Sequence, residues 1–498
     1  MRKFFFLLFI ISSAVSQAQK IADPKPFANL ITEADLKKHL YIVASKDFAG
    51  RETATEGQRK AAAYIENHFK SIGLAPGNGS NYQLYYPVYQ DSLSSAEITV
   101  NGQTFTLNED FTVNVGADNS STLMGSEIVF AGHGVSDSSR DDYNGVNAAG
   151  KIVLILNDPS AQRRVPGRRF NPYTVQEAAQ KHGAIAVLIV ADNFPRKGNS
   201  SKGNMYLNAF KKTNYPNTFF VSEKIAKAIM GDDYATAKNG NAQPKMYEAN
   251  VKLALNKDVE QLQSSDVLGY LEGTDLKDQL VVISAHYDHL GTRNADIYYG
   301  ADDDGSGTVS ILEMAQAFAK AKAAGKGPRR SILFLANSGE EKGLWGSEYY
   351  TDHPTYPLDK TTVDLNIDMI GRLDDTRKKG DSTNYVYVVG DDKLSTDLKK
   401  ISETENKKYT KMELDYKFND PNDQQRIYYR SDHFNFARKG VPIIFYYDGM
   451  LDADYHKPTD TPDKINYDVM AKRAKLVFYT AWDMANRNDM LKRDIPLK

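Results

Sequence analysis

The stretch SILFLANSGEEKGLWGSEYY, residues 331–350, joins an apolar run directly to two adjacent glutamates, Glu340 and Glu341. The run at 331–336 carries no charge and has the composition of a buried strand. Adjacent like charges are most often solvated, but the carboxyl ends of strands in an α/β sheet are also where ligands bind. The surroundings of the two carboxylates therefore decide whether they have a role.

Similar apolar runs recur through the second half of the chain, and each ends in polar residues. They are QLVVISAHYD (279–288), RRSILFLANSGEE (329–341), TTVDLNIDMIGR (361–372), YVYVVGDD (385–392) and VPIIFYYDG (441–449). A helical stretch with a broad apolar stripe, residues 307–324, separates the first two runs. The pattern predicts an α/β fold with a mixed, largely parallel sheet flanked by helices.

Acidic residues and histidines gather at the carboxyl ends of these runs. The clusters are His286, Asp288 and His289; Asp302, Asp303 and Asp304; Glu340 and Glu341; Asp368; and Tyr455 with His456. Each cluster alone has a structural explanation, as a helix cap, a turn or a solvated pair. Because the carboxyl ends of parallel strands meet at one edge of a sheet, we expect the clusters to share one crevice.

Several carboxylates in one crevice would raise one another's pKa values unless cations lay between them. The chain has no cysteine, so a metal site here must use His, Asp and Glu. Zinc accepts these ligands and keeps one position open for water in catalytic sites. Two histidines and three carboxylates suffice for two ions if one carboxylate bridges. One of the paired glutamates could then bind metal while its neighbour takes a proton from the water.

The first residues, MRKFFFLLFIISSAVSQA (1–18), have the features of a signal peptide: a basic start, a short apolar core and small residues before Gln19. The apolar core is too short to span a bilayer comfortably, although an uncleaved anchor is the alternative. An exported chain without cysteine fits a bacterial periplasmic or secreted protein. With a net charge of −2 and no basic stripe, we expect no nucleic-acid partner. No later segment has the ~20 apolar residues of a membrane span.

Six ordered blocks resemble the co-catalytic dizinc aminopeptidases related to bacterial leucyl aminopeptidase and glutamate carboxypeptidase. The blocks are AHYDHLG, GADDDGSG, NSGEEKGLWGS, NIDMIGR, RSDHFNFARKGVPIIF and DYHKPTDT. The resemblance covers about residues 256–498, together with the early block DFAGRETATEGQRKAAAYIENHFKSIGLAPG (47–77). It implies the zinc exopeptidase fold and two Zn²⁺ ions per chain.

The resemblance also implies a role for individual residues. One zinc would be bound by His286 and Asp368, the other by Glu341 and His456, and Asp303 would bridge both. Glu340 would be the general base, Asp288 would orient His286, Tyr455 would hydrogen-bond the tetrahedral intermediate, and Arg430 would face the substrate. His289, Asp432 and His433 are expected to support the ligands or line the pocket. The remaining histidines, His39, His68, His133, His182 and His353, are expected to be structural or exposed.

The middle of the chain resembles a protease-associated domain. The matching stretches are SEIVFAGHGV, DDYNGVNAAGKIVLI and QEAAQKHGAIAVLIV, in which short strands alternate with helices. A polar stretch that follows them, residues 232–245, is expected to be a loop. We therefore expect an α/β protease-associated insertion at 96–255, between catalytic parts at 19–95 and 256–498.

Together these features predict an exported zinc exopeptidase acting on peptides, and they favour an aminopeptidase. A single-zinc glutaminyl cyclase and a non-catalytic peptide-binding receptor on the same fold are the alternatives. The ligand set is complete, which argues against both. Carboxypeptidase or dipeptidase specificity stays open, as does the oligomeric state.

Overall fold

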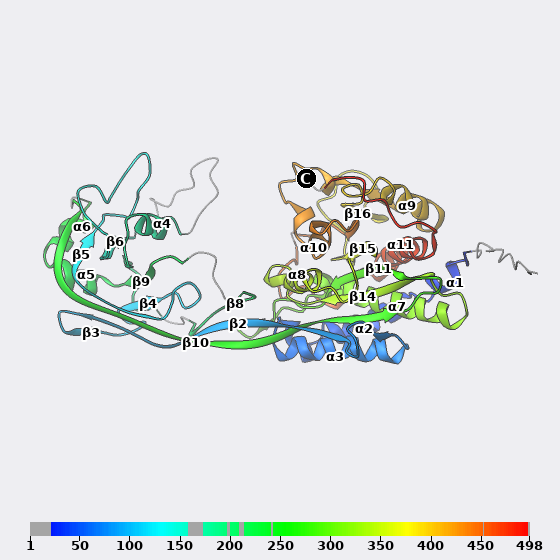
Figure 1. Cartoon of the computed structure of the whole chain (residues 1–498), viewed down its shortest axis with the longest axis horizontal. Helices are drawn as coiled ribbons and strands as arrows, with labels where there is room; N and C mark the ends of the chain where they lie inside the picture. The colour runs from blue at the N-terminus through cyan, green and yellow to red at the C-terminus, as the bar shows by residue number, and fades with distance from the viewer. Residues whose placement is uncertain are drawn as a thin grey trace, which may run out of the picture. The chain divides into compact units, whose positions relative to one another are not determined.

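The computed structural model describes residues 21–157, 173–196, 200–208, 214–240, 243–451 and 453–496. The predicted signal peptide, residues 1–18, and its cleavage site lie outside these ranges. The chain forms two compact units, one made of residues 1–86 with 264–498 and the other of residues 87–263 (Figure 1). Within the described ranges, no helix combines the length and the apolar character needed to cross a membrane.

The first unit is built on a sheet whose central strands are parallel. Its order is β17 (Glu413–Asp415), β16 (Tyr385–Val389), β18 (Ile443–Tyr447), β15 (Thr361–Ile367), β11 (Leu276–His286), β14 (Arg330–Asn337) and β10 (Lys245–Leu271). Strands β18, β15, β11 and β14 are mutually parallel, whereas β10 pairs antiparallel with β14 and β16 with β18. The predicted fold class, a mixed and largely parallel sheet, is confirmed.

Helices cover both faces of this sheet, which explains why its central strands are buried on both faces. One core joins Val281, Ile283 and Phe334 to α2 (Glu33–Val43), α3 (Glu56–Ser71), α7 (Gly307–Ala323) and α11 (Tyr467–Asn486). The smaller α1 (Lys25–Ala28) and α9 (Leu398–Glu405) join the same core. The other core joins Leu333 and Leu335 to α8 (Trp345–Asp352) and α10 (His433–Arg438). Because helices cover both faces, a ligand reaches these strands at their carboxyl ends.

The second unit is an α/β module inserted between the two parts of the first. The strand order of its sheet is β10, β5 (Ser121–Phe130), β6 (Ile152–Leu156), β7 (Ala186–Val190), β9 (Asn217–Val221) and β4 (Phe111–Val113). Strands β5, β6, β7 and β9 are mutually parallel. Strand β2 (Gln83–Val100) pairs with β3 (Gln103–Phe105) and β8 (Lys202–Tyr206), and the helices are α4 (Thr174–Lys181), α5 (Glu223–Met230) and α6 (Asp233–Lys238). Helix α6 occupies part of the polar stretch expected to be a loop, because Tyr234 and Ala237 on one side of it are buried.

The borders between the two units lie inside long strands. The predicted borders at 95/96 and 255/256 fall within β2 and β10, whereas the compact units meet at 86/87 and 263/264. Strands that run on without a turn leave no Gly- or Pro-rich linker to mark where one unit ends. A hairpin turn at Asn101 and Gly102 joins β2 to β3, and both residues have positive φ.

Candidate metal centre

The acidic and histidine clusters of the sequence meet at the carboxyl edge of the first unit's sheet. His286 is the last residue of β11, and Asp368 directly follows β15. Asp303 lies in the turn Ala301–Ser306 that leads into α7, and Glu340 and Glu341 lie in the turn after β14. His456 comes from the loop that follows β18. The chain thus brings together all five residues expected to bind metal.

One half of the centre surrounds the Nε2 atom of His286. This atom lies 3.3 Å from Asp303 Oδ1, 3.5 Å from Asp368 Oδ1 and 3.9 Å from Glu340 Oε2. His286 is almost completely buried, and its Nδ1 is 3.1 Å from the backbone oxygen of Asp288, which fixes the ring orientation. We name this half the His286 side.

The other half surrounds the Nε2 atom of His456. This atom lies 3.0 Å from Glu341 Oε2 and 3.2 Å from Asp303 Oδ2. We name this half the His456 side. The two carboxylate oxygens of Asp303 therefore face different imidazoles, which is the arrangement a bridging ligand requires.

The donor atoms of the centre fit divalent cations. His286 Nε2, Asp303 Oδ2 and Glu341 Oε1 are buried and have no hydrogen-bond partner, although buried polar atoms in proteins nearly always have one. These atoms are imidazole nitrogens and carboxylate oxygens, the donors that zinc accepts when thiolates are absent. One ion on the His286 side and one on the His456 side would satisfy these unpartnered atoms.

The pKa values of the two histidines also indicate a site suited to cations. Burial alone would lower the pKa of His286, but the Glu340 and Asp368 carboxylates raise it well above its ordinary value. Burial also opposes the charged form of His456, yet its contacts with Asp303 and Glu341 raise its pKa to about 10. The protein alone would therefore hold protons here to balance the carboxylates, and metal cations can take the place of those protons.

Three further aspartates position the metal-binding segments through backbone hydrogen bonds. Asp304 accepts hydrogen bonds from the backbone N–H groups of His286, Gly307 and Met369, at 2.8 to 3.2 Å. Asp460 accepts from the backbone N–H groups of Asp302 and Asp303. Asp302 accepts from Gly371 at 2.7 Å. The sequence pattern predicted no role for these three aspartates, because hydrogen bonds to backbone N–H groups leave no motif in the sequence.

Asp288, which was expected to orient His286, lies beside the ring with both its carboxylate and its backbone oxygen. The carboxylate oxygen lies 3.7 Å from His286 Nδ1, and it is the backbone oxygen that contacts the ring. The Asp288 carboxylate instead accepts hydrogen bonds from the Glu340 backbone N–H at 3.2 Å and from Thr53 Oγ1 at 2.7 Å. Asp288 therefore joins the segment carrying His286 to the segment carrying Glu340.

Arg51 is a completely buried cation that also supports the centre. Its guanidinium donates to the backbone oxygens of Val43, Tyr287, Tyr299 and Gly300, at 2.7 to 2.9 Å. Tyr287 follows the ligand His286, and Gly300 precedes the turn that carries Asp303. The four acceptors replace the water that the buried guanidinium has lost. Their hydrogen bonds also fix the segment that carries His286 and the segment that carries Asp303.

We expect Arg51→Met to lower the free energy of unfolding by about 3–5 kcal/mol, because four buried carbonyl groups lose their donor. Urea unfolding of the two proteins measures the change. Arg59→Met is the matched control, since Arg59 is exposed on α3 and donates only to Ala54 O at 3.3 Å. An equal effect of both substitutions would contradict the role given to Arg51.

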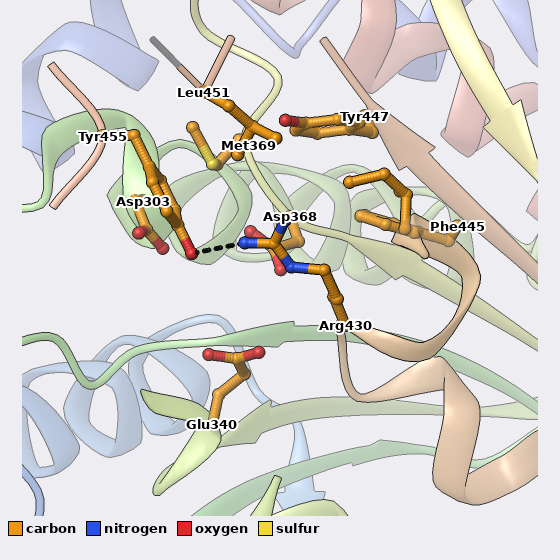
Figure 2. A pocket seen from close by; sticks show the side chains of 10 residues that line it. Asp303, Glu340, Asp368, Met369, Arg430, Phe445, Tyr447, Leu451 and Tyr455 are labelled. Carbon is orange, nitrogen blue, oxygen red and sulfur yellow. Dashed lines mark hydrogen bonds between the residues drawn. The ribbon is translucent and has the colours of Figure 1, made fainter. Parts of the chain in front are cut away.

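A pocket opens beside the His286 side (Figure 2). Polar groups of Asp303, Glu340, Asp368, Arg430 and Tyr455 face it, and its apolar lining is Met369, Ile427, Phe445, Tyr447 and Leu451. Arg430 donates a hydrogen bond to the Tyr455 hydroxyl at 3.0 Å. The sequence analysis named the polar residues but none of the apolar lining, because single apolar residues in loops and strands carry no motif.

The other histidines and Asp432 divide between this site and the rest of the fold. His289 lies within the metal centre, with Nδ1 2.7 Å from Glu341 Oε1. His433 is buried against the backbone oxygen of Tyr428, and Asp432 accepts from Ser347. His39 pairs with Glu313 at 3.1 Å, and His68, His133, His182 and His353 contact backbone or side-chain groups elsewhere.

The sequence of this chain is similar to those of known peptidases. Residues 266–481 match the model of peptidase family M28. The chain is 27% identical over 303 residues to the "Probable leucine aminopeptidase" of Arthroderma otae, covering 60% of this chain and 77% of the relative. It is 30% identical over 214 residues to the protein of that name from Trichophyton verrucosum, covering 42% and 55%.

Two solved structures share the fold over nearly the whole chain. The aminopeptidase from Aneurinibacillus sp. strain AM-1 superimposes with a TM-score of 0.55 at 18% identity, covering 96% of this chain and all of that one. BSAP, a zinc aminopeptidase from Bacillus subtilis, gives 0.53 at 19% identity, covering 94% and 98%. The first unit therefore has the zinc exopeptidase fold, and residues 266–481 are a peptidase domain of family M28.

Proposed function

We propose that this chain is a zinc-dependent exopeptidase, an aminopeptidase that releases residues from the N-terminus of peptides. The observation that carries the proposal is Asp303, whose two oxygens face His286 and His456 within 3.3 Å. Two zinc ions per chain would be held there, one by His286, Asp303 and Asp368, the other by Asp303, Glu341 and His456. When bound, they would lower the pKa of water and polarise the scissile carbonyl group.

Glu340 is suited to be the general base. Its carboxylate faces the pocket from the turn after β14, on the side opposite Tyr455 and Arg430 (Figure 2). Burial, with the nearby Asp368 and Glu341 carboxylates, raises its pKa well above the ordinary value, while His286 opposes the change. A carboxylate of raised basicity can take the proton of the attacking water and return it to the leaving amine.

Tyr455 is suited to stabilise the oxyanion. Arg430 donates its N–H to the tyrosine oxygen, so the tyrosine O–H proton remains free to donate to substrate. The guanidinium also places a positive charge beside the hydroxyl, which strengthens it as a donor toward developing negative charge. Arg430 thus faces the substrate side of the pocket, and the apolar lining of the pocket fits an apolar N-terminal side chain.

The remaining parts of the proposal concern location and the inserted unit. The features of residues 1–18 support export to the periplasm or the medium. The inserted unit has the alternating strands and helices of a protease-associated domain, with a parallel core of β5, β6, β7 and β9.

A peptide panel tests the proposal directly. We expect hydrolysis of peptides with a free N-terminus and of their C-terminally amidated forms, but no hydrolysis of N-blocked forms. A chelator should abolish the activity because it removes the ions from the donor atoms described above. Added zinc should restore the activity. Cleavage of N-blocked peptides from the C-terminus would contradict aminopeptidase activity, and one zinc per chain with cyclisation of N-terminal glutamine would indicate a cyclase.

A further inference from the structure

His289 is a fully buried histidine inside the centre that has no assigned partner. It follows β11 by three residues, and its side chain is completely buried. Both ring nitrogens lack a hydrogen-bond partner. Nδ1 lies 2.7 Å from Glu341 Oε1 and 3.8 Å from Asp303 Oδ2. An imidazole whose nitrogens make no hydrogen bond is costly in a protein interior, so the close approach of Nδ1 to two carboxylates requires an explanation.

The contact with Glu341 is not a well-formed hydrogen bond. The two atoms are close enough, but neither His289 Nδ1 nor Glu341 Oε1 has a hydrogen-bond partner of acceptable geometry. An imidazole nitrogen and a carboxylate oxygen placed side by side are also the kinds of donor that one zinc ion accepts. The donor atoms of His289, Asp303 and Glu341 all lie within 4.8 Å of one another.

The surrounding backbone fixes the His289 ring in this place. Gly300 has positive φ and packs against the ring, since a Cβ added at Gly300 would lie 2.5 Å from His289 Cγ. The His289 backbone N–H donates to Arg51 O at 3.3 Å. The ring is therefore held towards Glu341 and Asp303 by packing.

We propose that His289 is a metal ligand, binding through Nδ1 the ion that Asp303, Glu341 and His456 hold. This inference rests on the proposed dizinc function. The His456 side then has four protein donors, whereas the His286 side has three: His286, Asp303 and Asp368. Four protein ligands are characteristic of closed structural zinc sites, and three with an open position are characteristic of catalytic ones. The two ions would therefore differ in role.

This asymmetry agrees with the position of Glu340. Its carboxylate is 3.9 Å from His286 Nε2, on the side that keeps an open coordination position. The water to be activated would then belong to the His286 side. The ion on the His456 side would be held more tightly and would mainly fix Asp303 and Glu341.

A crystal structure of the zinc-loaded protein tests the assignment without any substitution. We expect His289 Nδ1 at about 2.0–2.1 Å from one of two zinc ions, with the three other donors around the same ion. A distance beyond about 3 Å, in a crystal that holds both ions, would overturn it. That outcome would leave the proposed peptidase function intact, whereas a centre that binds no zinc would overturn both.

Calorimetric zinc titration of His289→Phe provides the second readout. We expect the affinity for one of the two ions to fall by more than about 100-fold, since loss of even a supporting contact costs 10- to 100-fold. His456→Phe should weaken that same ion. The matched control is His433→Phe, because His433 is equally buried but lies against the Tyr428 backbone oxygen and the Phe445 ring rather than among the metal donors. Unchanged affinity for both ions in a folded His289→Phe protein would refute the proposal.

Discussion

Glu340→Gln is expected to lower kcat for peptide hydrolysis by about 10²–10⁴-fold while both zinc ions stay bound. Glutamine has the shape of glutamate but cannot take a proton from water. The ions should remain because Glu340 is the most distant of the carboxylates around His286, at 3.9 Å against 3.3 Å for Asp303. Steady-state kinetics with metal analysis of the same sample measures both effects.

The neighbouring residue supplies the matched control for this prediction. Glu341→Gln changes the same functional group one residue along, but Glu341 Oε2 lies 3.0 Å from His456 Nε2. We expect this variant to bind one of the two ions more weakly, and added zinc should partly restore its rate. Excess zinc should have no such effect on Glu340→Gln. A near-normal rate in Glu340→Gln would show that another group accepts the proton.

The sequence predicted the convergence of the metal-binding residues because the residues that decide it are local and periodic. Each of His286, Asp368 and Glu340 lies at the end of a strand that is buried on both faces or within three residues after it. In a parallel sheet this position alone places a side chain at the shared edge. The distances between the side chains did not follow from the pattern, since they depend on turns such as Ala301–Ser306, whose backbone is irregular.

Other features could not be predicted, because they depend on backbone groups and on packing. The role of Arg51 follows from four carbonyl oxygens in three separate segments, which no residue type reveals. No role was predicted for Asp304, because its neighbour Asp303 matched the position of the bridging ligand. In the structure, Asp304 accepts hydrogen bonds from three backbone N–H groups. Helix α6 was expected to be a loop, since its stabilising contact is the burial of Tyr234 rather than a helical pattern.

Asp303→Asn is expected to have the largest effect of any single substitution, with loss of both ions and of measurable hydrolysis, a fall in kcat/KM of about 10⁴-fold or more. Asp303 contributes one oxygen to each side. Asparagine keeps one of these oxygens, replaces the other by an NH2 group that donates rather than accepts, and removes the negative charge that both ions share, so both sides are weakened. The activity assay is paired with zinc titration of the purified variant.

Asp368→Asn separates this prediction from a general effect of removing charge from the centre. Asp368 contacts only the His286 side, at 3.5 Å from His286 Nε2, so its variant should lose one ion and keep the other. Zinc that binds the folded state stabilises it, and the stabilisation rises with the logarithm of its affinity. The zinc-dependent rise in Tm should therefore be full in the wild type, partial in Asp368→Asn and absent in Asp303→Asn. Equal responses in the two variants would contradict a bridging role for Asp303, because a carboxylate shared by two ions must affect both.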